Sequence, residues 1–246
     1  YLVNWLERTE LLLGKEKLAK LQKANVLVVG LGGVGAYAAE MICRAGVGRM
    51  TIADPDFVEV TNRNRQLTAL MSTTGQFKAD VLGKRFHDIN PDIELNVIKE
   101  FIRDEKTEEL LDQGRFDYVV DAIDTLSPKV FLIYNSLRRG LKLISSMGAG
   151  GRLNPSMIRV ADISESYNCR LARVIRKRLS KLGIRGGFKV VFSFENAIVE
   201  AIRKEEDQNK KSVAGTISYL PPLFGCYIAG AVINDLIDEK TIDSNF

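Results

Sequence analysis

Short runs of apolar residues alternate with amphipathic stretches in the part of the chain that precedes Met147. Continuous apolar runs of this length are typical of strands buried on both faces of a parallel sheet. They occupy residues 25–30, 49–54, 95–98, 118–122 and 141–145. Stretches with helical periodicity or composition lie at residues 34–45, 76–90, 106–113 and 128–139. The alternation predicts an α/β fold, with a Rossmann-like, doubly wound, mostly parallel sheet.

The two ends of the chain depart from this alternation. Residues 1–22 have the pattern of one or two amphipathic helices, which we expect to pack on the sheet. The later part predicts an appended C-terminal β/helical region. Its expected elements are strands at 158–163 and 189–195, a basic helix between them, a mobile surface loop at 205–211 and a terminal helix at 223–237.

A glycine-rich turn joins the first expected strand to the first expected helix. It reads Gly30-Leu-Gly32-Gly33-Val-Gly35. A strand, tight turn and helix in this order bring free backbone N–H groups and the positive end of a helix to one point, where a phosphate binds. Asp54 ends the next expected strand, 22 residues after Gly32. An acid there is the usual acceptor for ribose hydroxyls, although it could instead cap the next turn.

Positive and negative side chains follow the same expected strands. Arg65 and Lys78 come after Asp54, on the side of the sheet where the phosphates of a bound nucleotide would extend. Asp121 and Asp124 follow the strand at 118–122, so at least one of them should lie at the carboxyl edge of the sheet. A carboxylate there can hold magnesium on phosphate oxygens. The set suits substitution at phosphorus, which needs mainly positioning and positive charge.

Histidine and cysteine are scarce. The single histidine, His87, lies inside an expected helix, and nothing around it supports a catalytic triad. Three scattered cysteines, Cys43, Cys169 and Cys226, fit a reducing cytosol and cannot form a zinc site. Cys169 is either a nucleophile activated by its basic neighbour or a structural thiol. A substrate carboxylate, by contrast, is ionised at neutral pH and needs no base, so carboxylate adenylation fits these residues.

The net charge of +4 is unevenly distributed. Residues 170–189 contain eight basic residues and no acid, so the rest of the chain carries +4 minus +8, or −4. The eight are Arg170, Arg173, Arg176, Lys177, Arg178, Lys181, Arg185 and Lys189. Such a local field indicates a polyanionic partner, and the alternative is a solvated helix face.

We expect a cytoplasmic protein without a membrane segment. The longest stretch without charges, residues 212–234, has a strongly apolar part of only 14 residues, 220–233, that includes Pro221 and Pro222. A buried helix fits it better than a membrane span. The first 15 residues mix apolar and charged side chains, unlike a signal peptide, and the start at Tyr1 suggests a trimmed terminus.

The chain resembles the adenylating superfamily of ubiquitin-activating enzymes and their bacterial relatives over nearly its whole length. The resemblance rests on features that occur in the same order along the chain: the glycine turn, Asp54, the segment 62–66, Lys78 and Asp124. The resemblance implies ATP and Mg²⁺ as cofactors, with Asp124 as the magnesium ligand. It implies an ATP site formed by Gly30, Gly32, Gly33, Gly35, Asp54, Asn62, Arg65, Gln66 and Lys78. It also implies that Arg65, Lys78, Asp124 and Arg8 are catalytic, with Arg8 supplied across a homodimer.

Four further segments resemble the branch that dehydrates threonylcarbamoyladenosine in tRNA. They are residues 61–66, 121–124, 148–151 and 191–195. This branch activates the carboxylate of the modified adenosine 37 with ATP, and the carbamoyl group then expels AMP and closes a ring. The resemblance implies such a tRNA as partner and a link to a sulfur-transfer or cysteine desulfurase system. The basic segment supports this branch independently, because tRNA is a polyanion, and we expect tRNA to be bound by Arg170, Arg173, Arg176, Lys177 and Lys181.

The resemblance also implies one adenylating-enzyme domain over residues 1–246. Within it we expect an N-terminal helical segment (1–24), a nucleotide-binding core (25–151) and a substrate-side and dimer-forming region (152–246). Three alternatives remain open. They are an adenylyltransferase for a ubiquitin-like sulfur carrier, a nicotinamide-dependent oxidoreductase, and a non-catalytic RNA-binding module that has kept the nucleotide fold.

Overall fold

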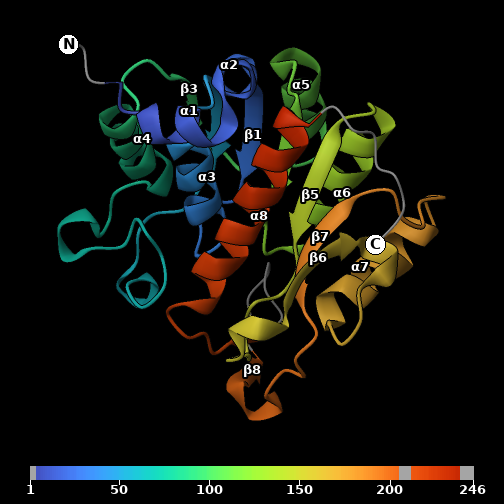
Figure 1. Cartoon of the computed structure of the whole chain (residues 1–246). Coiled ribbons are helices and arrows are strands. Elements are labelled where there is room, and N and C mark those ends of the chain that lie inside the picture. Colours follow the sequence, from blue (N-terminus) through green and yellow to red (C-terminus); the bar gives the residue numbers. More distant parts are fainter. Residues whose placement is uncertain (1–3, 205–211, 239–246) are drawn as a thin grey trace.

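A seven-stranded sheet forms the centre of the computed structural model, which describes residues 4–204 and 212–238 (Figure 1). Its strands are β1 (Asn25–Val29), β2 (Arg49–Ala53), β3 (Glu94–Ile98), β4 (Tyr118–Asp121), β5 (Lys142–Ser146), β6 (Ile158–Asp162) and β7 (Lys189–Ser193). They lie in the order β3-β2-β1-β4-β5-β7-β6, with β6 antiparallel to β7 and the other neighbours parallel. The predicted Rossmann-like sheet is confirmed, and the two C-terminal strands extend it. A small antiparallel pair, β8 (Ile202–Lys204) and β9 (Ser212–Ala214), lies apart from it.

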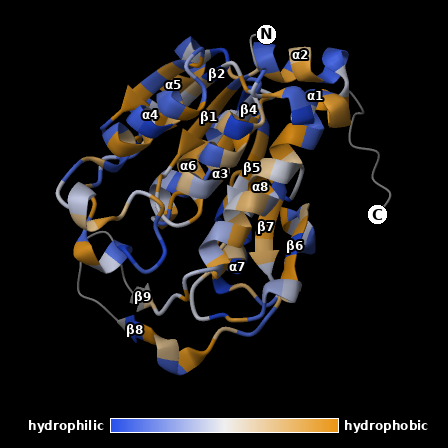
Figure 2. Ribbon diagram, turned by 60° about the vertical axis from the view of Figure 1, so that its left-hand side comes forward, coloured by the Kyte–Doolittle hydropathy of each residue, from blue (hydrophilic) through white to orange (hydrophobic). Residues whose placement is uncertain are grey.

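Helices cover both faces of the sheet. They are α1 (Glu7–Leu13), α2 (Lys15–Lys23), α3 (Gly35–Arg44), α4 (Lys78–Ile89), α5 (Glu105–Gly114), α6 (Leu126–Arg138), α7 (Arg170–Ser180) and α8 (Leu220–Ile237). Successive residues of a strand point to opposite faces. Val26 and Val28 of β1 therefore join a core with α3, α4 and α8, while Leu27 and Val29 join a second core with α5, α6 and α7. Figure 2 shows the apolar strands between the two helical layers.

The terminal helix α8 is long and apolar enough to cross a membrane by length and composition, with a mean hydropathy of 1.4. It packs against α3, and Phe224, Ile228 and Val232 are fully buried there. Gly225 allows the two helices to approach closely, because its missing Cβ would lie only 2.6 Å from the carbonyl oxygen of Val34. The predicted buried terminal helix is therefore confirmed.

The N-terminal helices differ from each other in burial. Helix α2 buries Leu18 and Leu21 and packs against α8. Helix α1 buries none of its residues, and Leu11 and Leu12 are 81% and 83% exposed. The expectation that this segment packs on the core holds fully for α2, whereas α1 contributes only the partly buried Leu13, because consecutive leucines on a helix point in different directions. The expected loop at 205–211 lies outside the described residues.

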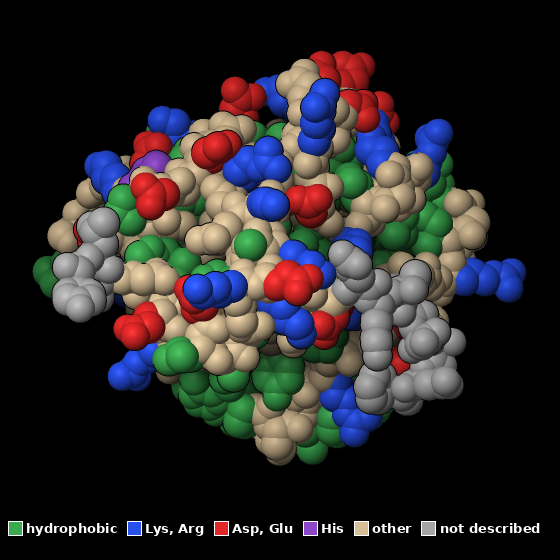
Figure 3. Space-filling model, turned by 45° about the horizontal axis from the view of Figure 1, so that its top comes forward, with side chains coloured by type: hydrophobic (Ala, Val, Ile, Leu, Met, Phe, Trp, Pro, Cys, Tyr) green, Lys and Arg blue, Asp and Glu red, His purple; other side chains and the backbone are tan. Residues whose placement is uncertain are grey.

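The two edges of the parallel sheet have different surroundings. At the amino edge, Gly48, which precedes β2, donates to the carbonyl oxygen of Leu21 at 3.2 Å. This edge faces the viewer in Figure 3, where basic and acidic side chains are interspersed. The carboxyl edge carries the glycine turn after β1 and the loops that follow β2, β4, β5 and β7. In open α/β sheets, ligands bind outside the carboxyl ends of the strands.

Candidate active site

The glycine turn connects β1 to α3 at the carboxyl edge. Gly30 has a φ of +91°, and a Cβ there would lie 2.6 Å from the carbonyl oxygen of Ala122. A Cβ on Gly35 would lie 1.8 Å from the carbonyl oxygen of Gly30. Around a Cβ on Gly32, by contrast, the nearest atom is Nε2 of Gln66, at 3.8 Å. The outer glycines therefore close the turn, and a Cβ on Gly33 would also meet Pro221 at 3.0 Å, while Gly32 faces the open space that a phosphate needs.

Asp54 ties the turn to the end of β2. It is 5% exposed, and its two carboxylate oxygens accept hydrogen bonds from the backbone N–H groups of Leu31 at 2.6 Å and Asp56 at 2.8 Å. Burial raises the pKa of Asp54, and Lys78 together with the two amide donors opposes this rise. The carboxylate lies beside the glycine turn, where the sequence predicts the ribose ligand.

Lys78 is the first residue of α4 and is 5% exposed. Its ammonium group donates to Oδ2 of Asp56 at 2.8 Å, and the side chain of Asp56 is 58% exposed. The sequence reasoning did not single out Asp56. This exposed carboxylate balances the buried ammonium group and directs it toward the Asp54 side of the site. Phosphate oxygens could replace it as the partner of Lys78.

The segment 60–66 forms a wall of the site. Asn62 is buried and its Oδ1 accepts from the N–H of Glu59 at 3.1 Å. Arg65 donates from Nη1 to the carbonyl oxygen of Thr61 at 3.1 Å. Gln66, which approaches the glycine turn, has a buried Oε1 without a hydrogen-bond partner among the described residues. A buried polar atom of this kind is costly unless a ligand satisfies it, so the wall fits a bound nucleotide.

The two aspartates after β4 have different surroundings. Asp121 is fully buried, and its Oδ2 accepts from Ser145 Oγ at 2.6 Å and pairs with Lys129 Nζ at 2.8 Å. Lys129 is also fully buried, and it donates to the carbonyl oxygen of Ile123 at 3.1 Å. The N–H group of Ile123 in turn donates to Asp121 Oδ1 at 3.1 Å. This internal ion pair holds the turn that carries Asp124, and sequence reasoning missed Lys129. Its signal was a lysine within an apolar helix, eight residues after Asp121.

Asp124 is the exposed one of the two aspartates, and it lies on the loop between β4 and α6. The expectation that at least one of the two aspartates lies at the carboxyl edge is confirmed. Residues 4–204 and 212–238 contain no group of three or more His, Cys, Asp or Glu side chains that could hold a metal ion by themselves. Magnesium is often held by one or two carboxylates together with substrate phosphates and water, which suits Asp124.

Arg152 joins the loops that follow β5 and β7 to the segment that precedes α7. It is 5% exposed, and its guanidinium donates to the carbonyl oxygens of Gly148 at 2.6 Å, Asn168 at 3.1 Å and Glu195 at 3.0 Å. The carboxylate of Glu195 in turn accepts from the N–H groups of residues 153 and 154. Two of the segments that resemble the tRNA-modifying branch, 148–151 and 191–195, are therefore held together by two side chains.

A further hydrogen bond connects these loops to the phosphate side. Asn64 donates from Nδ2 to the carbonyl oxygen of Thr216 at 2.9 Å. Gly215, the preceding residue, accepts from the N–H of Gly151 at 2.8 Å. The wall at 60–66 and the loop at 148–151 are thus bridged by the segment that precedes α8.

The basic helix α7 lies near the carboxyl edge at both ends. Asn168, which precedes it, donates to the carbonyl oxygen of Phe194 at 3.0 Å, and Arg178 donates to Oγ of Ser127, at the start of α6, at 3.1 Å. Four of the five predicted tRNA-binding residues are exposed: Arg170, Arg173, Lys177 and Lys181.

Two basic residues of the segment are used inside the fold. Arg176 is half-buried and donates to the carbonyl oxygen of Ser166 at 2.6 Å and to the hydroxyl of the same residue. Lys189 pairs with Asp235 of α8 at 2.6 Å. The structure therefore assigns Arg176 to the support of the loop before α7, and its role in binding tRNA stays a prediction.

Arg8 is far from its own chain's site. Its helix packs through Leu6 beside Gly46, where a Cβ would lie 2.8 Å from Leu6 Cδ1, and Gly46 precedes the amino end of β2. Asp54 follows the opposite end of the same strand. The structure therefore does not bring Arg8 together with the other predicted residues of one chain, and a role across a dimer stays a prediction.

The remaining candidates for nucleophilic chemistry lack suitable surroundings. His87 is exposed on α4. Cys169 is 5% exposed at the start of α7, and Cys226 is exposed on α8; both are free thiols, and burial raises the pKa of Cys226. Cys43 is buried, and burial together with the charge of Glu40 raises its pKa to about 12. A thiol with a raised pKa is a poor nucleophile at neutral pH.

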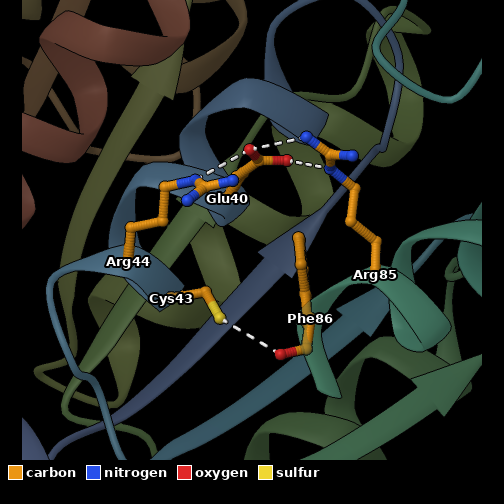
Figure 4. Close-up of polar contacts among 5 residues, drawn as sticks. All are labelled: Glu40, Cys43, Arg44, Arg85 and Phe86. Atoms are coloured by element: carbon orange, nitrogen blue, oxygen red, sulfur yellow. Dashed lines mark hydrogen bonds and ion pairs between the residues drawn. The ribbon is translucent and has the colours of Figure 1, made fainter. Parts of the chain in front are cut away.

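A buried carboxylate clamps α3 to α4, the helices that begin at the glycine turn and at Lys78 (Figure 4). Glu40 accepts from Arg85 Nε at 2.5 Å and from Arg44 Nε at 2.9 Å. Burial acts to raise the pKa of Glu40, but the hydrogen bonds from the two arginines outweigh it and lower the pKa. Nearby, the thiol of Cys43 donates to the carbonyl oxygen of Phe86.

Known proteins are similar to this chain over nearly its whole length. The model of the ThiF family matches residues 6–245. The tRNA threonylcarbamoyladenosine dehydratase of Bacillus subtilis (strain 168) is 42% identical over 249 residues, which cover 98% of this chain and 98% of that protein. The crystal structure of E. coli tRNA N6-threonylcarbamoyladenosine dehydratase in complex with ATP has a TM-score of 0.86 and 32% identity. The match covers 94% of this chain and 93% of that one.

A relative that is named for a different activity matches a smaller part. The adenylyltransferase and sulfurtransferase MOCS3 of Anopheles gambiae is 37% identical over 120 residues, which cover 49% of this chain and 27% of that protein.

Proposed function

Since this chain belongs to the ThiF family, we propose that it catalyses the ATP-dependent dehydration of N6-threonylcarbamoyladenosine at position 37 of tRNA to the cyclic form. The observation that carries the proposal is the grouping at one sheet edge of the glycine turn, Asp54, Lys78, the unsatisfied amide of Gln66 and Asp124. The nearly complete similarity to the dehydratase of Bacillus subtilis supports the choice of substrate.

The first step is adenylation. The ionised carboxylate of the threonyl group attacks the α-phosphorus of ATP, and the bond from that phosphorus to the bridging oxygen breaks, which releases pyrophosphate. The glycine turn and Asp54 hold the nucleotide, and Lys78 and Arg65 balance the negative charge that collects on the phosphate oxygens. A magnesium ion held by Asp124 would neutralise further phosphate charge.

The second step closes the ring. The carbamoyl group attacks the activated acyl carbon and loses a proton, and the bond from that carbon to the oxygen of AMP breaks. The carboxylate oxygen leaves with AMP, so the base has lost one water. The loops joined by Arg152 and Glu195 lie beside the nucleotide site and would hold the threonyl arm in place.

The tRNA would approach along α7. The exposed Arg170, Arg173, Lys177 and Lys181 supply positive charge near the carboxyl edge, and phosphate contacts provide most of the affinity of proteins for nucleic acids. We further propose a cytoplasmic homodimer in which Arg8 reaches the partner's site, because Arg8 lies at the opposite edge of its own sheet. The exposed Leu11 and Leu12 of the same helix supply an apolar surface for such a contact.

The test is mass analysis of the nucleosides from modified tRNA after incubation with the protein, ATP and magnesium. The expected product is a nucleoside lighter than threonylcarbamoyladenosine by one water, with one pyrophosphate released for each nucleoside converted. Omitting ATP and using tRNA without the modification are the controls. Unchanged threonylcarbamoyladenosine, together with adenylation of a ubiquitin-like sulfur carrier, would overturn the proposal in favour of the adenylyltransferase alternative.

A further inference from the structure

A group of aromatic side chains lies beyond the carboxyl end of β7, next to the start of α7. Tyr167 is 45% exposed, yet its ring contacts two others. It stacks on Phe194, with ring centroids 5.6 Å apart and an interplanar angle of 29°, and it meets the buried Phe192 edge to face at 5.8 Å. An exposed tyrosine ring that is held by two neighbouring rings presents a fixed flat surface to solvent.

The backbone that carries Tyr167 is fixed as well. Asn168 has a φ of +52°, and its side chain donates to the carbonyl oxygen of Phe194. Its own carbonyl oxygen accepts from the guanidinium of the buried Arg152 at 3.1 Å. The loop that carries Tyr167 is thereby anchored from both sides, and the ring needs little ordering when a ligand stacks on it.

Positive charge surrounds the aromatic group. The guanidinium of Arg159, which is exposed on β6, lies 4.7 Å from the ring centroid of Phe194. Arg170 and Arg173 follow Tyr167 on the first turns of α7 and are exposed. The nearby acid Asp162 uses its carboxylate on the N–H groups of residues 187 and 188, which leaves Glu165 as the exposed acid of this loop. The net charge of the exposed side chains around the aromatic group is therefore positive.

We propose that Tyr167, Phe194 and Arg159 form a stacking site for an unpaired base of the tRNA loop, next to the modified adenosine. Aromatic rings and arginine planes beside basic residues are the features with which proteins bind single-stranded RNA bases. β7 lies three strands from β1, or about 14 Å at a strand spacing of about 4.8 Å. That distance places the stacking site on a neighbouring nucleotide rather than on the base that reacts.

This inference rests on the proposed function, because the ligand is taken from the tRNA substrate. The variants Tyr167→Ala and Tyr167→Phe are compared in binding a modified anticodon stem-loop by fluorescence anisotropy. Loss of one base stack weakens binding by about 5- to 150-fold, so the alanine variant should bind that much more weakly than the parent. The phenylalanine variant keeps the flat ring and should bind like the parent. Arg159→Gln should weaken binding as well, by a smaller factor.

Salt dependence separates stacking from charge. The slope of log affinity against log salt should stay unchanged in Tyr167→Ala, whereas Arg173→Gln should reduce it by about 0.7 to 0.9 if one phosphate contact is lost. ATP affinity, measured on the same proteins, is the control for intact folding. A second measurement uses the parent protein alone: 2-aminopurine, placed in turn at each neighbour of the modified adenosine, should be quenched on binding at one of the two positions.

Equal RNA affinity of Tyr167→Ala and the parent would overturn the stacking site. An equal loss in Tyr167→Phe and Tyr167→Ala, or an absence of quenching at both neighbours, would overturn it too. In each case, product formation by the parent protein would leave the proposed function standing. Failure of the parent to convert the modified tRNA would instead count against the proposed function itself.

Discussion

The buried ion pair between Asp121 and Lys129 allows a sharp test of how the loop after β4 is held. Both side chains are fully buried, and the oxygen and nitrogen atoms are 2.8 Å apart. Replacing Lys129 with Met leaves the carboxylate of Asp121 buried without its counter-charge. Removing one partner of such a pair costs about 3–5 kcal/mol of unfolding free energy. For a chain of this size, that corresponds to a drop in melting temperature of about 6–20 °C.

The double variant Asp121→Asn/Lys129→Met separates the pair from its two halves. Each single variant leaves one buried charge, whereas the double variant leaves none. The loss of unfolding free energy in the double variant should therefore be smaller than the sum of the two single losses, by about 3 kcal/mol. Equilibrium urea unfolding of the four proteins measures this coupling. Lys106→Met is the matched control, because Lys106 pairs with Glu100 at the exposed surface, where the loss of an ion pair should leave the urea midpoint almost unchanged.

Activity gives a second measurement that stability alone does not determine. Lys129 donates to the carbonyl oxygen of Ile123, and the N–H of Ile123 donates to Asp121, so the pair also shapes the turn that carries Asp124. The double variant should therefore keep a low turnover number even under conditions in which it is fully folded. Costs that add within about 0.5 kcal/mol would refute the coupling. Full activity in a stable double variant would refute the role in positioning Asp124.

Three further changes test other parts of the site. Asp124→Ala should abolish turnover with an unchanged melting temperature, and substantial product formation would exclude its magnesium role. Mixing Arg8→Ala with Asp124→Ala protein should restore part of the activity if a dimer shares its sites, whereas no recovery would place each site within one chain. Glu40→Gln should cost roughly 1–3 kcal/mol at neutral pH by weakening the bonds from Arg85 and Arg44. Because the folded pKa of Glu40 is lowered, its contribution is present above its unfolded pKa and is lost as pH falls through the folded pKa, so urea unfolding of parent and variant should converge in acid.

The parts of the fold that were predictable are those governed by local pattern. Apolar runs such as residues 25–30 identify strands buried on both faces, and the glycine spacing at 30–35 identifies the turn, because both signals lie within a few consecutive residues. The place of β7 between β5 and β6 was not predictable in this way. It depends on pairing between segments far apart in the chain, which no local pattern encodes.

The sequence predicted the site residues that follow strands, but it did not predict the buried side chains that hold those residues in place. Asp54 follows β2 and Asp124 follows β4, and parallel strands bring their carboxyl ends to one edge. Lys129, Arg152 and Arg176 look like surface charges in the sequence, yet each is buried or half-buried against carbonyl oxygens or a carboxylate. Whether a long cationic side chain enters the interior depends on the partners that the complete fold provides there, and composition does not reveal them.

The hydrogen bond from Asn64 to Thr216 joins the wall of the nucleotide site to the segment that anchors the 148–151 loop. If ATP displaces that wall, the same bond moves the loops that we propose to contact the tRNA. Thermodynamic linkage then requires reciprocity: the factor by which ATP changes the affinity for tRNA must equal the factor by which tRNA changes the affinity for ATP. Through the side-chain amide of Asn64, each of the two substrates would thereby change the affinity of the protein for the other by the same factor.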